Sequence, residues 1–283
     1  MKKYFCAALC LVLVLLCLPA LAETEVFCGL EIDLAAQAID FGDTPVTDVP
    51  GLMALIDRMP NLRQVDMYAS ALKKEEMDQL FDGYPQIFFG WTLVIERNHV
   101  VRTDATSFST LHGRCPNHET EAFEVLRYCR NLVALDLGHN YIRDISFLRN
   151  FPKMKVLILA CNLIEDISVL AELKELEYLE LFSNRIRDLS VLAELPMLKD
   201  LNISNNPCTD LTPLYGMDHL ERFWSGMNEK RITYQERREM EAALPDCAFF
   251  WDGEPTQGGW RKHHRYDTIY AIFNEGGYRP FQK

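Results

Sequence analysis

The sequence lacks the short motifs with which many enzymes hold phosphates, metals or nucleophiles. It contains no G-x-S-x-G, no phosphate-binding loop, no H-E-x-x-H and no Gly-rich dinucleotide turn. It also lacks a basic patch, and its net charge of −12 makes nucleic acid a poor partner. We therefore predict a protein that is not an enzyme and that uses neither a cofactor nor a metal.

Long apolar runs are confined to the N-terminus. Two lysines precede an apolar run over residues 7–18, and an Ala-Leu-Ala sequence ending at Ala22 follows it. Because this run is too short to span a bilayer comfortably, it predicts a secretory signal peptide over residues 1–22. No later stretch is apolar enough to span a membrane, so we expect a secreted, extracellular protein.

What the sequence does contain is a period of 22 residues over four consecutive copies. One slot always holds leucine: Leu135, Leu157, Leu179 and Leu201. Another always holds asparagine: Asn140, Asn162, Asn184 and Asn206. A fixed period of this length is typical of stacked supersecondary units, each of which buries too little apolar surface to fold alone.

The physical role of each slot follows from its residue type. The alternation in Leu135-Asp136-Leu137 predicts a short strand. Asparagine offers a donor and an acceptor together, so we expect the four asparagines to form a structural ladder with backbone groups of adjacent turns. A constant Asp-x-Ser/Thr follows, at Asp144, Asp166, Asp188 and Asp210, and predicts caps for the next tight turn.

The pattern L-x-x-L-x-L-x-x-N-x-I resembles the leucine-rich repeat family, in particular the 22-residue repeats of bacterial, secreted, internalin-like proteins. The resemblance implies an α/β solenoid shaped as a horseshoe. Its concave face would carry a parallel β-sheet, and its convex face 3-10 or short helices. The resemblance also implies that a ligand binds on the concave strand face.

Less regular segments extend the repeat in both directions. Residues 72–91 and 232–251 each place a charged helical stretch before a proline, two phenylalanines and a tryptophan, which predicts a helix followed by a strand. Strands are also expected near Ile39, Asn61 and Val101. We therefore assign irregular repeats to 23–117, regular repeats to 118–228, and a helical repeat with a C-terminal cap to 229–283.

The cap is predicted from a break in the period. Its apolar residues recur at helical spacing: Trp260, Tyr266, Ile269, Tyr270 and Phe273. Since a solenoid needs a lid over its last open core, we expect this helix to close the end of the stack.

The register also gives the side chains expected to point outward from the concave face. Aromatic and apolar residues gather there beside acidic ones, which is the usual composition of an interface core. The predicted ligand-binding residues are Val156, Ile158, Tyr178, Glu180, Phe182, Asp200 and Trp224. We expect them to bind a protein, peptide or glycan, unless the terminal segments cover these rings.

Other interpretations remain open at this stage. His112, Cys115 and His118 could bind zinc, although a fourth ligand is not evident and a solvated loop fits as well. A small hydrolase site could lie around Thr103 and Asp104, with Thr106 beside them. A purely structural surface or matrix protein is a further alternative.

Six cysteines follow the predicted signal peptide, and an even number permits disulfides in a secreted chain. Cys129 and Cys208 occupy slots that are otherwise apolar, so we expect buried thiols there. Cys28 and Cys115 are the cysteines most free to pair.

Overall fold

The computed structural model describes residues 23–95, 99–111, 117–226, 232–252 and 260–281. The predicted signal peptide, His112 and Cys115 lie outside these residues. The chain divides into two units between Trp91 and Thr92. The division falls within the segment predicted as irregular repeats, so that the last part of that segment belongs with the regular repeats.

The first unit begins with an antiparallel hairpin of β1 (Thr24–Phe27) and β2 (Leu30–Asp33). The two turn residues between them, Cys28 and Gly29, have φ angles of +50° and +78°. Positive φ at both positions is what a tight two-residue hairpin turn requires.

A three-stranded parallel sheet follows in the same unit, in the order β3 (Ala38–Asp40), β4 (Gln64–Asp66) and β5 (Phe88–Gly90). Helices α2 (Val49–Ile56) and α3 (Lys74–Gly83) connect these strands. The strands expected near Ile39 and Asn61 and the helix-then-strand pattern of 72–91 are thereby confirmed.

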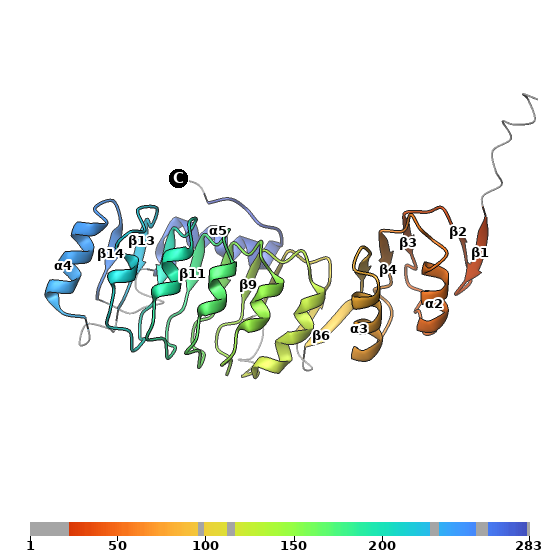
Figure 1. The fold of residues 1–283 in the computed structure, drawn as a ribbon, viewed down its shortest axis with the longest axis horizontal. Coiled ribbons are helices and arrows are strands. Elements are labelled where there is room, and N and C mark those ends of the chain that lie inside the picture. The colour runs from red at the N-terminus through yellow and green to blue at the C-terminus, as the bar shows by residue number, and fades with distance from the viewer. Residues whose placement is uncertain (1–22, 96–98, 112–116, 227–231, 253–259, 282–283) are drawn as a thin grey trace, which may run out of the picture. The chain divides into compact units, whose positions relative to one another are not determined.

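The second unit contains a seven-stranded sheet, drawn from yellow to blue in Figure 1. Its parallel strands follow chain order: β8 (Ser107–Ser109), β9 (Ala134–Asp136), β10 (Val156–Ile158), β11 (Tyr178–Glu180), β12 (Asp200–Asn202), β13 (Arg222–Trp224) and β14 (Ala248–Phe250). Leu135, Leu157 and Leu179 are register partners across adjacent strands. The repeat period is therefore the strand-to-strand step of the sheet.

Short 3-10 helices connect most of these strands: η1 (Thr120–Tyr128), η2 (Ser146–Asn150), η3 (Ser168–Glu172), η4 (Ser190–Glu194) and η5 (Thr212–Leu214). Helix α4 (Tyr234–Ala243) connects β13 to β14, as the sequence predicts. A hairpin of β6 (Thr92–Ile95) and β7 (His99–Arg102) precedes β8. The strand expected near Val101 is thus split between an antiparallel hairpin and the first strand of the sheet.

The asparagine ladder has the predicted backbone partners. The amide Nδ2 of Asn184 donates to the carbonyls of Leu159 and Leu181 at 2.9 and 3.0 Å, and its Oδ1 accepts from the Ile164 amide at 3.1 Å. Equivalent bonds recur at Asn162 and Asn206. Asn140 likewise donates to the Leu137 carbonyl and accepts from the His118 amide, but its second donor bond goes to the Thr110 hydroxyl instead of a carbonyl. Each asparagine therefore satisfies buried backbone groups of its own repeat and of the preceding one.

The aspartate slots cap the 3-10 helices as predicted. In each repeat the aspartate carboxylate accepts the amide hydrogen of the residue two positions later, at 2.7 to 2.9 Å. The hydroxyl-bearing partners are Ser146, Ser168, Ser190 and Thr212. Because these amides begin a helical turn, they would otherwise lack an acceptor.

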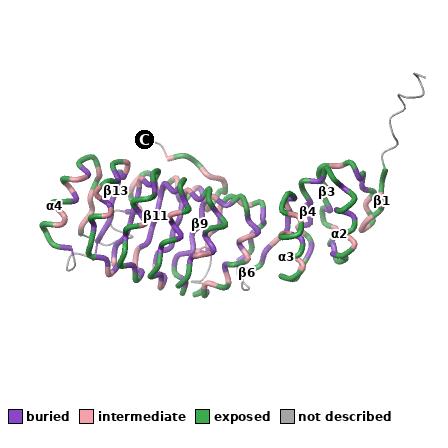
Figure 2. Tube along the Cα trace, in the orientation of Figure 1, coloured by how far each residue is buried: buried purple, intermediate pink, exposed green. Residues whose placement is uncertain are grey.

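The apolar core of this unit lies between the sheet and the 3-10 helices, where the middle side chain of each strand from β9 to β13 and several side chains of each turn are fully buried. Strands β9 to β13 are buried along their whole length, while Figure 2 shows exposed residues gathered on the connecting segments. The strands are buried on both sides, so something must also cover the face that points away from the 3-10 helices.

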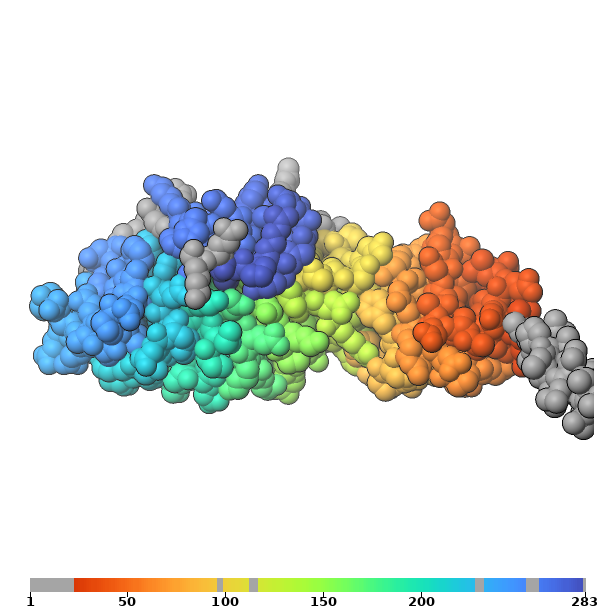
Figure 3. All heavy atoms as spheres, turned by 90° about the horizontal axis from the view of Figure 1, so that it is seen from above, coloured from red at the N-terminus to blue at the C-terminus, as the bar shows by residue number. Residues whose placement is uncertain are grey.

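That cover is the C-terminal segment, which we define as residues 260–281. It comprises η6 (Trp260–Lys262), helix α5 (His264–Glu275) and the residues that follow. Figures 1 and 3 both show α5, in dark blue, on the side of the sheet away from the 3-10 helices. The predicted helix is present, but its predicted place as a lid over the end of the stack is wrong, because it lies across the strands.

Candidate functional site

The face of the seven-stranded sheet that points away from the 3-10 helices is called the inner face here. It carries every residue predicted to bind a ligand. Six of the seven are no more than 4% exposed, and Phe182 is half-buried. The buried residues are Val156, Ile158, Tyr178, Glu180, Asp200 and Trp224. The expectation that they form an exposed cluster is therefore wrong, and the alternative that a terminal segment covers them is correct.

Apolar packing holds the C-terminal segment on this face. Trp260, Ile269 and Ile272 join a buried cluster with side chains of strands β9, β10, β11 and β13. The Trp260 ring lies 5.4 Å from that of Tyr178 and 6.1 Å from that of Trp224, between ring centroids. The aromatic residues that resemble an interface core in the sequence do form one, within the same chain.

Glu180 is fully buried and receives several hydrogen bonds. Arg261 Nη2 and Trp260 Nε1 each donate to its carboxylate at 3.2 Å, and so does the Tyr178 hydroxyl. Burial, followed by the charge of Glu180, raises the pKa of Tyr178 well above its usual value. The phenol therefore stays protonated and remains a donor.

Asp200 is the second buried carboxylate, and two arginines neutralise it. Arg222 on the neighbouring strand donates from Nε at 2.9 Å, and Arg265 of helix α5 donates from Nη1 at 2.8 Å. Arg265 also forms an ion pair with Glu221. The Arg222 guanidinium lies over the Trp260 ring, 4.4 Å from its centroid, which adds a cation–π contact.

The chain returns along the same face after α5. The Tyr278 hydroxyl donates to Glu177 at 2.7 Å, and Lys199 donates to the same carboxylate at 2.7 Å. Burial would raise the pKa of Glu177, but these two hydrogen bonds hold it below its usual value. Residue 281 then lies near Tyr178, with the Phe281 ring 6.2 Å away.

Asp136 is the remaining buried carboxylate of the inner face. Its oxygens accept from the Gly138 amide at 3.0 Å and the Ser109 hydroxyl at 3.3 Å. Burial raises the pKa of Asp136 to about 7, with a smaller contribution from the charge of Glu180, while the hydrogen bonds and Arg261 oppose the rise. This carboxyl group is thus poised to change charge near neutrality.

A cavity of about 220 Å³ lies between helix α5 and the strands beside Asp136. Most of its lining is apolar or aromatic: Leu111, Ile158, Tyr266, Ile269, Tyr270 and Phe273. Ser109, Asp136 and Asn274 supply the polar part of the wall. Tyr270 is 62% exposed, so the cavity reaches the protein surface beside it.

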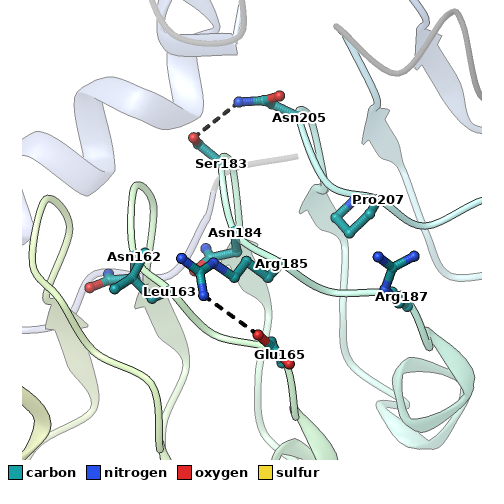
Figure 4. A pocket seen from close by; sticks show the side chains of 9 residues that line it. All are labelled: Asn162, Leu163, Glu165, Ser183, Asn184, Arg185, Arg187, Asn205 and Pro207. Atoms are coloured by element: carbon teal, nitrogen blue, oxygen red, sulfur yellow. Dashed lines mark hydrogen bonds and ion pairs between the residues drawn. The ribbon is translucent and has the colours of Figure 1, made fainter.

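A second hollow, of about 450 Å³, follows the edge of the asparagine ladder (Figure 4). Its lining is almost entirely polar, and several of these groups already contact each other. Arg185 pairs with Glu165 at 3.6 Å, and Asn205 donates to the Ser183 hydroxyl at 3.0 Å. The hollow is therefore an open polar edge of the stack, and we place no site there.

The residues weighed for hydrolase chemistry are engaged in the fold. The Thr103 side chain is fully buried. Arg102 binds both oxygens of Asp104, at 3.0 and 2.7 Å. The Thr106 carbonyl accepts backbone hydrogen bonds from Val133 and Ala134, at the start of strand β9. These contacts support a structural role for the segment.

Four of the residues considered for disulfides or zinc lie within the described part of the chain: Cys28, Cys129, Cys208 and His118. Cys129 and Cys208 are buried, as predicted, and Cys28 is a free cysteine. His118 is buried, with its ring 5.6 Å from that of His99. Within the described residues there is no group of three or more potential metal ligands, and none of the described helices is long and apolar enough to span a membrane.

Part of the chain matches a known family of repeats. Residues 130–172 and 173–222 each match the family described as Leucine Rich repeats (2 copies). Among curated proteins no sequence matches the chain.

Solved structures of other proteins are similar to parts of this chain at low identity. Internalin C2 from Listeria monocytogenes is 21% identical over 67% of this chain and 82% of its own, with a TM-score of 0.35. Internalin F from the same organism is 15% identical over 82% of this chain and 71% of its own, with a TM-score of 0.40. The Leptospira interrogans protein LIC12759 is 17% identical over 78% of this chain and 56% of its own, with a TM-score of 0.40. The family match covers residues 130–222, and the parallel sheet with its 3-10 helices is the architecture of a leucine-rich repeat solenoid.

Proposed function

We propose that this protein is a secreted recognition module without enzymatic activity, which binds a protein or peptide on the surface that the C-terminal segment forms over the inner face. The observation that carries the proposal is the complementarity of the inner face to this segment. Glu180 and Asp200 receive Arg261 and Arg265, while the aromatic rings of strand and helix pack together.

The surface offered to a partner is then different from the one expected from the sequence. Tyr178 and Trp224 stabilise the docked segment from below. Tyr270 is exposed on α5 at the cavity, with exposed Asn274 one turn further along. A tyrosine with one free face and a nearby apolar cavity supports a contact with a partner.

The test is affinity capture from the native growth medium with three forms of the purified protein. The unchanged protein and the control Tyr234→Ala should retain the same partner, and the double variant Tyr270→Ala with Asn274→Ala should lose it. Tyr234 is a suitable control because it is an exposed tyrosine on another helix, 78% exposed against 62% for Tyr270. Equal capture by all three forms would count against the proposed surface.

Secretion is part of the proposal and has its own test. The lysine pair and apolar run before Ala22 support removal of residues 1–22 on export. N-terminal sequencing of protein recovered from the medium should begin at Glu23. Recovery only from the cells, with Met1 retained, would contradict this part.

One observation favours a structural role as the second candidate. The inner face, where leucine-rich repeat proteins are expected to bind ligands, is covered here by the C-terminal segment, and this packing stabilises the repeats. Under that alternative, arrays of proteins and glycans would give no specific binding by either the unchanged protein or the Tyr270 variant.

A further inference from the structure

The buried acids of the inner face differ in one respect. Glu177 has Lys199, Glu180 has Arg261, and Asp200 has Arg265. Each of these three carboxylates therefore has a basic side chain within ion-pairing distance.

Asp136 has no such neighbour among the residues that the structure describes. Its two hydrogen bonds come from the Gly138 amide and the Ser109 hydroxyl, both of which are neutral donors. Burying a carboxylate that has no ion-pair partner is costly, and the charge of Arg261 and the two hydrogen bonds offset only part of that cost at Asp136. The place where a countercharge would stand is the cavity described above, whose wall includes Asp136.

The rest of the cavity wall suits the body of an organic cation. Tyr266, Tyr270 and Phe273 surround it with aromatic rings, and Ile158 and Leu111 add aliphatic surface. Aromatic faces attract ammonium groups, and aliphatic walls pack against methylene groups.

The same wall disfavours other ligands. An anion would meet the Asp136 carboxylate directly. A calcium or magnesium ion needs six or more oxygen ligands, whereas the cavity supplies a single carboxylate with a hydroxyl and an amide at its wall. The volume of about 220 Å³ has room for a short alkyl chain with its charged head, and not for a large metabolite.

We propose that the cavity beside Asp136 binds an alkylammonium group, supplied either by a free amine or by a lysine side chain of a partner. The ammonium pairs with the Asp136 carboxylate, and its methylene groups lie among Tyr266, Tyr270 and Phe273. This inference deepens the proposed function, because the cavity reaches the surface at Tyr270, where a partner is proposed to bind.

The test uses isothermal titration calorimetry on the full chain at pH 8 with matched small probes. n-Butylammonium should bind, whereas 1-butanol and pentanoate, which have a similar length and different charge, should bind at least tenfold more weakly. Comparison of Nα-acetyl-lysine methylamide with n-butylammonium distinguishes a lysine side chain from a free amine as the natural source, and the norleucine counterpart is the uncharged control for the lysine probe. No measurable binding of either ammonium probe, or equal binding of butanol and butylammonium, would overturn the proposal.

Variants locate the binding. Asp136→Asn keeps the size of the side chain and should weaken butylammonium at least tenfold, and Tyr270→Ala should weaken it about threefold through loss of a cation–π contact. Asp267→Asn removes a carboxylate that is exposed on the same helix and should leave binding unchanged. An unchanged affinity in Asp136→Asn would refute the site.

A second variant keeps the inference testable if Asp136→Asn does not fold. Asn274 lines the cavity from an exposed position, so Asn274→Lys places a tethered ammonium at its rim, and Asn274→Gln is the uncharged control. The lysine variant should melt at a higher temperature than the glutamine variant and should no longer bind butylammonium. Identical melting and binding in the two variants would argue against an ammonium site. Because these measurements need no partner, their failure is distinct from a failure of the capture experiment.

Discussion

The Arg265 guanidinium lies 2.8 Å from the Asp200 carboxylate, although 65 residues separate the two in the chain. Both side chains are almost fully buried, at 7% and 0% exposure. This contact ties helix α5 to strand β12. It gives the inner face a charged anchor in addition to its apolar packing.

Replacing Arg265 with methionine should loosen the C-terminal segment. The variant leaves Arg222 as the partner of Asp200, so we expect the free energy of unfolding to fall by roughly 2–4 kcal/mol, below the effect of a wholly unpaired charge. Urea denaturation measures the change. Lys262→Met removes an exposed charge nearby and should lower the free energy of unfolding by no more than about 0.5 kcal/mol. Equal losses in the two variants would mean that the buried ion pair does not contribute to stability.

The raised pKa of Asp136 predicts a pH dependence of stability. The folded state holds the proton up to about pH 7, whereas the unfolded carboxyl ionises near pH 4. The folded state therefore binds more protons in this window, so the stability contributed by this group falls as pH rises from about 4 to about 7 and is constant above it.

Asp136→Asn removes this titration. The variant should be more stable than the unchanged protein at pH 8, by at most roughly 4 kcal/mol, and the difference should shrink toward pH 4. Urea denaturation of both proteins at pH 5 and pH 8 measures it. A difference that does not vary with pH would show that Asp136 does not titrate in this range.

The asparagine ladder predicts a large effect from a single amide. Asn184→Ala leaves the Leu159 and Leu181 carbonyls and the Ile164 amide without this partner, so we expect a loss of about 2–4 kcal/mol in thermal or urea unfolding. Asn150→Ala is the matched control, since Asn150 is exposed and donates to one carbonyl, of Phe147. A loss no greater than that of Asn150→Ala would contradict the structural role of the ladder.

The aspartate caps of the 3-10 helices should stabilise the folded state by an amount that depends on pH. Hydrogen bonds from the backbone and side chain of Ser168 hold the pKa of Asp166 below its usual value. Asp166→Ala should cost about 0.5–1.5 kcal/mol at neutral pH. Because the folded pKa is lowered, this contribution is present above the unfolded pKa and is lost as pH falls below about 4.

Unfolding curves at pH 7 and pH 3 test the cap. The neighbouring Glu165→Ala removes an exposed charge outside the cap and should have little effect at either pH. If Asp166→Ala and Glu165→Ala are equally stable at pH 7, the capping interpretation fails.

The inner-face aromatics should behave as core residues. Trp224 is 4% exposed and stacks on Phe250 with ring centroids 4.4 Å apart. Trp224→Ala should therefore lower stability by about 3–5 kcal/mol. The exposed Tyr270→Ala should change stability by less than about 1 kcal/mol. A Trp224→Ala protein with an unchanged melting curve would mean that this face is open in solution.

The repeating part of this fold could be predicted because its cause is local and repeated. Leucine at 157 and asparagine at 162 meet the same neighbours in every copy, so the spacing alone indicates the strands, the ladder and the caps. The helix-then-strand pattern before Trp91 was also sufficient to predict α3 and β5. The β1–β2 and β6–β7 hairpins have no periodic signal and were not foreseen.

The position of the C-terminal segment could not be predicted in the same way. Its helical spacing indicates an amphipathic helix, but not which apolar surface covers it. The inner-face pairs of Arg265 with Asp200 and of Tyr278 with Glu177 join single positions far apart in sequence, and nothing repeats to reveal them. Tyr178 and Trp224 were therefore predicted to be exposed, because period-2 alternation predicts the face of the sheet to which a side chain points and not which segment covers that face.

The place of α5 also has a consequence for biosynthesis. A stack of repeats can fold one coil at a time as it leaves the ribosome, because each coil contacts mainly its predecessor. Here the C-terminal segment that covers Glu180 and Asp200 is translated after all seven strands of the sheet, and Ile272 accepts a hydrogen bond from Ser107, 165 residues upstream. Until this segment has been translated, the nascent sheet therefore shows its acidic and aromatic side to water and to chaperones, and the docking of the segment is the event that closes it.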